Sequence, residues 1–147
     1  MATPLGSAGF VRSEVEATNV KLQLFADKLG DLQNPQVALY LLRNSLGIAR
    51  ITHILRCIDS ATIRHQIKWF DAVLYSTLCE ICSCDISPDS WVQAGLPINM
   101  GGLGITHACT MAAAAYISSS LTFAARMTFT GFPGTYIATG GFTHSAQ

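Results

Sequence analysis

The segment at residues 96–105, which reads LPINMGGLGI, constrains the fold of this chain more than any other. Its Leu-Pro step is followed by three glycines within four residues, Gly101, Gly102 and Gly104. Glycine alone tolerates a positive φ and a close backbone approach without steric cost. We therefore expect Pro97 and the three glycines to form a structural corner that leads into a closely packed helix. A phosphate loop is not expected there, because the segment has no preceding strand and no Lys-Ser/Thr end.

Apolar residues recur at helical spacing through the middle of the chain, which predicts amphipathic helices. One stripe comprises Ile48, Ile51, Ile54, Leu55 and Ile58, and the next comprises Ile63, Ile67, Phe70, Leu74, Leu78 and Ile81. Asn34 and Ser87 are good N-caps, and each is followed by a proline at the first helical position. We predict an all-α fold, an irregular array of about five to six helices with a short N-terminal strand or turn and a poorly defined C-terminal tail. The expected helices cover residues 10–29, 35–46, 48–58, 61–84, 88–94 and 105–126.

The composition is unusually poor in charge for a single domain of 147 residues. Charged residues make up 12% of the chain and apolar residues 50%, so the charged share is about half of what is typical. This balance indicates helix faces that are normally covered by something else. The net charge is zero, so any surface that attracts nucleic acid must be local.

Such a local surface is indicated by the distribution of the basic residues, because eight of the nine lysines and arginines lie between Arg12 and Lys68. Several of them fall off the apolar stripes. The candidate nucleic-acid-binding residues are Arg43, Arg50, Arg56, Arg64 and Lys68. Arginine suits contact with phosphate, because its planar fork meets phosphate oxygens bidentately and positions a duplex without reading its sequence. The alternative is that these are ordinary solvated helix charges, some of them paired with Asp59 or Asp71.

Several short sequence segments occur along the chain in a fixed order: TPLGS at 3–7, DLQ at 31–33, WVQA at 91–94, the corner at 96–105 and AAYISS at 114–119. The pattern resembles the region C-terminal to the palm in reverse transcriptases of non-LTR retrotransposons. The resemblance implies a helical thumb-like domain over residues 1–126, with 1–9 as a residual palm-end segment, and a tail of uncertain structure over 127–147. It also implies an RNA–DNA or DNA duplex backbone and the missing polymerase domains as partners. Arg43, Arg50 and Arg56 sit at the matching positions.

The same resemblance implies that the chain is not an enzyme. The family holds its two metal ions with a Tyr-x-Asp-Asp turn and another palm aspartate, and this chain has no Asp-Asp pair. Its nine acidic residues are scattered over stretches with helical periodicity, where solvated faces and helix caps are the usual roles. We therefore expect a non-catalytic remnant of an RNA-directed DNA polymerase with latent, sequence-independent binding of the nucleic-acid backbone.

No cofactor, metal or small-molecule ligand is expected. Cys79 and Cys82 could share a helix face, but Cys84 lies about 200° further round, and no second pair completes a tetrahedral zinc site. We expect buried, reduced thiols. No signal-peptide pattern opens the sequence, so an intracellular protein, cytoplasmic or nuclear, is expected.

A rival interpretation comes from the absence of formal charge over residues 96–125. The stretch is long enough for a membrane helix of about twenty residues. However, Pro97, the glycines and several serines and threonines favour a helix packed in protein, so a membrane is not expected as a partner. The alternative function is a small helical interaction or membrane-associated protein with no nucleic-acid role.

Overall fold

A computed structural model describes residue 4 and residues 6–129 of the chain, the last three of them without their side chains. Over that part of the chain the fold is all-α, which confirms the predicted fold class. The α-helices are α1 (Ala8–Gly30), α2 (Pro35–Leu41), α3 (Thr52–Cys57), α4 (Arg64–Cys82), α5 (Pro88–Ala94) and α6 (Ala108–Phe129). Three short turns accompany them: the π-helical η1 (Leu42–Leu46) and the 3₁₀-helical η2 (Ile48–Arg50) and η3 (Ile98–Met100). The described residues before α1 form no strand, and most of the predicted tail, 130–147, lies outside the described residues.

Helices α2 and α5 begin at the caps that the sequence predicts, whereas α1, capped by Ser7, begins at Ala8, two residues before the predicted residue 10. The Asn34 side-chain oxygen accepts hydrogen bonds from the backbone N–H groups of Gln36 and Val37, at 3.1 and 3.2 Å. The Ser87 hydroxyl accepts one from the backbone N–H of Ser90 at 3.2 Å. Each cap satisfies donors that the first helical turn leaves free, so α2 and α5 begin at the prolines.

Two predicted helices are interrupted in the structure. The helix expected over 35–46 changes to the π turn η1, and the helix expected over 48–58 is split into η2 and α3. The two predicted helices are separated at Gly47, as expected, because its ψ of −155° lies outside the helical region. The unpredicted changes lie within them, at the π turn that follows Leu41 and at Ile51, which separates η2 from α3.

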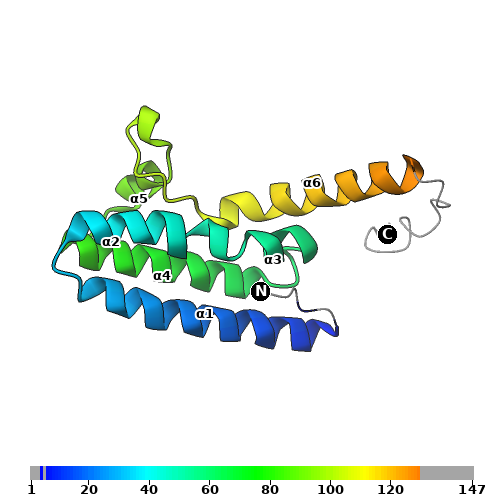
Figure 1. Ribbon diagram of the computed structural model, residues 1–147, viewed down its shortest axis with the longest axis horizontal. Helices are drawn as coiled ribbons and strands as arrows, with labels where there is room; N and C mark the ends of the chain where they lie inside the picture. Colours follow the sequence, from blue (N-terminus) through cyan, green and yellow to red (C-terminus); the bar gives the residue numbers. More distant parts are fainter. Residues whose placement is uncertain (1–3, 5, 130–147) are drawn as a thin grey trace, which may run out of the picture.

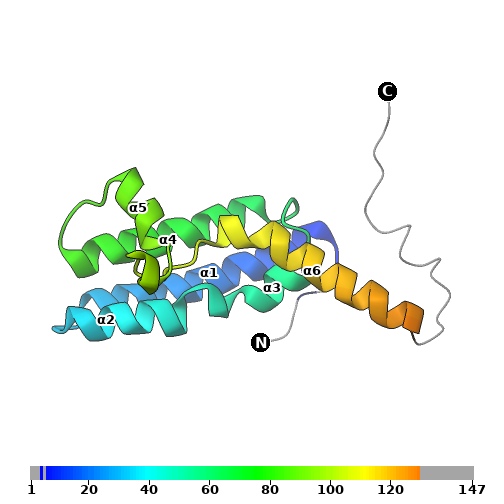
Figure 2. The ribbon, with the colours of Figure 1, turned by 90° about the horizontal axis from the view of Figure 1, so that it is seen from above.

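The core forms where α1, the α2–α3 segment and α4 lie side by side and alternate in direction (Figures 1 and 2). Its most deeply buried large side chains are Leu42, Leu55, Ile63, Phe70, Leu74, Leu78 and Ile105. Polar contacts fix the register between α1 and α4. The Asn19 amide donates to the backbone carbonyl of Gln66, and the Gln66 amide donates to the Glu16 carboxylate, both at 2.8 Å.

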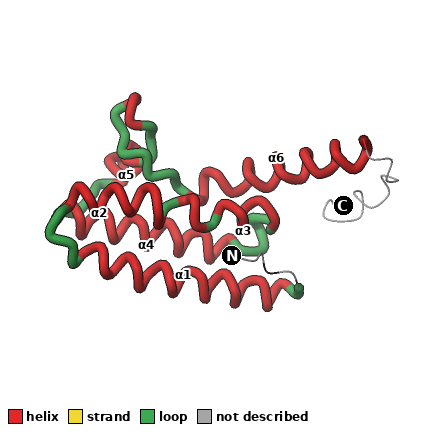
Figure 3. Tube along the Cα trace, in the orientation of Figure 1, coloured by secondary structure: helices red, strands yellow, loops and turns green. Residues whose placement is uncertain are grey.

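Helix α6 extends away from the bundle after its first turns (Figure 3). Ala108 and Ala112 are buried, whereas Ile117, Leu121 and Phe123 are 54%, 65% and 58% exposed. The first turns of α6 are therefore packed on the bundle, whereas the apolar side chains beyond Ala115 are not covered by the described residues. The absence of formal charge did not show which part of the helix is packed, because the packed and the projecting parts up to residue 125 both lack charged side chains.

Candidate nucleic-acid interface

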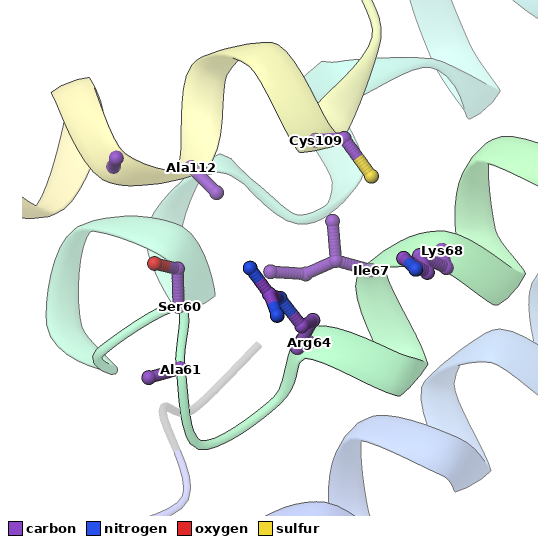
Figure 4. A pocket seen from close by; sticks show the side chains of 8 residues that line it. Ser60, Ala61, Arg64, Ile67, Lys68, Cys109 and Ala112 are labelled. Carbon is purple, nitrogen blue, oxygen red and sulfur yellow. The ribbon is translucent and has the colours of Figure 1, made fainter.

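An open cleft of about 630 Å³ lies between α4 and the first turns of α6. Arg64 and Lys68, one helical turn apart on α4, line one wall, and both are exposed. The remaining lining residues are Ser60, Ala61, Ile67, Cys109, Ala112 and Ala113. Figure 4 shows the Arg64 guanidinium reaching into the space between the Ser60–Ala61 loop and α6. The cleft thus combines two cations with uncharged, mostly small side chains, and among the described residues no carboxylate lines it.

Asp71 holds the α6 wall of this cleft in place. Its two carboxylate oxygens accept hydrogen bonds from the backbone N–H groups of Ala108 and Cys109, at 2.7 and 2.9 Å. These N–H groups open α6, so Asp71 acts as an N-cap supplied by another helix, where a carboxylate also complements the helix dipole. Asp59 likewise accepts from the backbone N–H of Ala61, at 3.1 Å. Both carboxylates that the alternative interpretation paired with basic residues therefore bond backbone groups.

Sequence reasoning missed the role of Asp71, because its partners are 37 and 38 positions away. A signal for it was present. The residue before α6 is His107, which is not a good N-cap, so α6 needed an acceptor from elsewhere. Because Asp71 accepts from the N–H groups of Ala108 and Cys109, α6 begins at Ala108 and not at the predicted residue 105.

The pKa of the Cys109 thiol depends on the charges around the cleft. Cys109 is exposed as a residue, but partial burial of its thiol, the hydrogen bond to Asp71 and the negative charge of Asp71 raise the pKa of the thiol to about 11, while Lys68 and Arg64 oppose the increase. Cys109 is therefore protonated at neutral pH and is a poor nucleophile.

The prediction of buried thiols is wrong for four of the cysteines. The exposed ones are Cys57, Cys82, Cys84 and Cys109.

The other three candidate arginines lie in different surroundings. Arg50 is half-buried, and its guanidinium lies 5.2 Å from the centre of the Phe25 ring, in a cation–π contact. With Lys21 it lines a separate cavity of about 40 Å³ between α1 and η2. Arg50 thus lies outside the core, but it contacts an aromatic side chain of α1. Arg43 is half-buried on η1 beside the glycine corner, and Arg56 is exposed on α3.

The predicted glycine corner follows α5 and is closed by backbone hydrogen bonds. Gly101 and Gly104 have φ values of +81° and +72°. Gly102 does not have a positive φ, but an added Cβ there would lie 2.0 Å from the carbonyl oxygen of Leu96. The Pro97 carbonyl accepts from the N–H groups of Met100 and Gly102, at 2.9 and 3.1 Å. The corner therefore needs glycine for two different reasons, handedness at two positions and close approach at the third.

An aromatic stack that sequence reasoning did not identify fastens α5 and the corner to α4. The Trp91 ring stacks on His107, with centroids 4.3 Å apart, and meets Tyr75 edge-on at 5.4 Å. The Tyr75 hydroxyl donates to the backbone carbonyl of Ile86 at 2.7 Å. Residues from α4, α5 and the segment before α6 are thereby joined, which fixes where α6 begins.

The described residues also bear on two other kinds of site, a metal site and a membrane-spanning helix. In residues 4 and 6–129, no three His, Cys, Asp or Glu side chains are grouped so that they could hold a metal ion. One helix in that part of the chain, Ala108–Arg126, is long and apolar enough to cross a membrane by length and composition, and 11% of it is buried. No protein-family model, curated protein or solved structure matches this chain.

Proposed function

We propose that this chain is a non-catalytic, thumb-like helical module that binds the phosphate backbone of a nucleic-acid duplex in the cleft between α4 and α6. The observation that carries the proposal is the pairing of Arg64 and Lys68 at one wall of an open cleft whose other lining residues are uncharged. The resemblance to the region C-terminal to the palm of retrotransposon reverse transcriptases supports the choice of a duplex as ligand.

The chemistry of the cleft suits phosphate. Residues four apart on a helix have Cβ atoms about 5–6 Å from each other, so Arg64 and Lys68 can meet neighbouring phosphates of one strand. Arg64 supplies a planar fork for bidentate contact, and Lys68 supplies a compact charge. Contacts of this kind position a duplex and carry no sequence information, so binding should be independent of sequence.

The proposal is tested by measuring the affinity for a labelled RNA–DNA hybrid by fluorescence anisotropy in about 100 mM salt, where counterion release still favours binding strongly. We expect the double variant Arg64→Ala, Lys68→Ala to weaken binding by about tenfold or more. The matched control is Lys28→Glu, which changes the net charge by the same two units at an exposed position of α1, on the opposite side of the molecule from α6 (Figure 1). Equal weakening by both variants would show that the charges act only through the overall field, and no cleft site would remain.

A second candidate function is supported by the exposed apolar side chains of α6. Under this alternative, α6 binds a lipid bilayer, and the cleft has no role. Flotation with neutral phosphatidylcholine vesicles separates the two functions. Recovery of the chain with the vesicles in high salt would favour the membrane-associated protein, whereas the nucleic-acid module should stay in the aqueous fraction.

A further inference from the structure

Helix α1 carries two apolar stripes, and only one of them is covered. The inner stripe is buried against the bundle and comprises Val11, Val15, Leu22, Ala26 and Leu29. The outer stripe comprises Phe10, Ala17, Val20 and Leu24, with Phe10, Val20 and Leu24 49%, 48% and 59% exposed. Spacings of seven, three and four residues keep the outer stripe on one side of the helix, nearly opposite the inner stripe. Exposed apolar side chains that recur on one outer helix face can form an interaction surface when a partner covers them.

The outer stripe is self-complementary about Ala17. Phe10 and Leu24 each lie seven positions from Ala17, one on either side. Glu14 and Lys21, both exposed, lie three before and four after it along the same edge of the stripe. Two antiparallel copies of α1 that cross at Ala17 therefore set Phe10 against Leu24 of the second copy. The same crossing sets Glu14 beside Lys21 of the second copy, and each pairing occurs twice.

We propose that the outer stripe of α1 binds a second copy of this chain as an antiparallel, two-fold symmetric pair. The apolar match is centred on Ala17 and the charge match lies half a residue further along, about 0.75 Å on the helix axis, so one two-fold axis can serve both. Ala17 lies at the midpoint of the apolar match, and its small side chain lets the two helices approach closely. A protein of unrelated sequence would have no reason to share this midpoint.

The pair is weak and leaves the cleft accessible. The stripe from Phe10 to Leu24 is about 21 Å long, so the interface falls at the small end of specific interfaces. Helices α1 and α6 lie on opposite sides of the bundle (Figures 1 and 2), so each copy presents its cleft away from the interface. Self-association therefore does not depend on the proposed nucleic-acid binding.

The test is charge reversal followed by sedimentation equilibrium over a wide range of protein concentration. Glu14→Lys and Lys21→Glu each place like charges together twice, and each should weaken the dimer by about tenfold. The double variant Glu14→Lys, Lys21→Glu restores opposite charges at both pairs, and the dimer should recover. Asp85→Lys, a reversal at an exposed loop position, is the control that should leave the dimer unchanged.

Far-UV circular dichroism checks that each variant keeps its helix content. We expect it to do so, because Glu14 and Lys21 are both exposed. A dimer in which the double variant is as weak as the single variants would overturn the antiparallel pairing. A wild-type chain that stays monomeric up to about 1 mM, the weak end of specific affinities, would overturn the proposal as a whole.

Discussion

Gly102 shows how a single backbone position limits the whole corner. An added Cβ there would lie 2.0 Å from the Leu96 carbonyl oxygen and 2.7 Å from that of Gln93, and both acceptors are held by hydrogen bonds. We expect Gly102→Ala to destabilise the protein by about 2–3 kcal/mol, because backbone atoms must shift. Gly101→Ala meets open space and pays only for its φ of +81°, about 1–2 kcal/mol. Thermal melting checks this order, and a larger loss for Gly101→Ala would contradict it.

Cys109 provides a chemical measure of the charges in the cleft. With a pKa of about 11, raised mainly by burial and then by Asp71, only about one thiol in a thousand is ionised at pH 8. Asp71→Asn removes the negative charge, so alkylation of Cys109 should accelerate. Arg64→Ala, Lys68→Ala removes the opposing charges, so alkylation should slow. Peptide mass spectrometry distinguishes Cys109 from the other cysteines, and rates that do not change in either variant would contradict this electrostatic account.

The raised pKa of Cys109 also links stability to pH. The folded state favours the neutral thiol, so the contribution of Cys109 to the free energy of unfolding is complete below the ordinary thiol pKa and is lost as the pH rises towards about 11.

The position of the corner glycines could be predicted from sequence, because a Leu-Pro step with three glycines marks a turn by itself. The reason for Gly102 could not, because the Leu96 carbonyl that excludes a side chain is placed by the folded corner.

At the scale of the elements, α6 depends on a cap from α4. Asp71→Ala removes both acceptors for the N–H groups of Ala108 and Cys109. We expect the loss of this cap to lower the free energy of unfolding by about 1–2 kcal/mol. Amide hydrogen exchange should accelerate in the first turns of α6 and should stay unchanged in α1. Asp85→Ala is the control. Equal protection of α6 in Asp71→Ala and the wild type would show that packing alone fixes its start.

The accuracy of the predicted helix ends depended on how clearly the local sequence marks them. Helices α2 and α5 begin at Asn34 and Ser87, where a capping residue is followed by proline, and the end at Gly47 was also predicted. Helix α1 begins two residues before the predicted residue 10, at its cap Ser7, and α6 is capped from 37 residues away, so its start was misplaced. The π turn η1 and the division of 48–58 into η2 and α3 were not predicted, because the apolar period continues through them.

At the scale of the whole molecule, the helices divide the basic residues into separate groups. The packing of α6 on α4 makes a cleft at Arg64 and Lys68, and the packing of η2 on α1 places Arg50 over Phe25. The sequence identified the residue types, but periodicity within one helix does not say which helices become neighbours. The choice of Arg43, Arg50 and Arg56 as first candidates followed the family resemblance and stays a prediction.

Polymerase activity is not expected from the purified chain. The resemblance assigns metal binding to a Tyr-x-Asp-Asp turn, which the sequence lacks. Primer extension with Mg²⁺ or Mn²⁺ should stay at the level of a heat-denatured sample. Reproducible extension that is lost on denaturation would contradict the non-catalytic account.

The salt dependence of binding tests the central claim most directly. Affinity for the labelled RNA–DNA hybrid is measured from about 50 to 200 mM salt, where each phosphate contact adds nearly one unit to the slope of log affinity against log salt. We predict that Arg64→Ala, Lys68→Ala flattens this slope by about one to two units, while the control Lys28→Glu, with the same change in net charge, leaves it unchanged. Equal affinity and slope for the wild type and the cleft variant at every salt concentration would contradict nucleic-acid binding in the cleft.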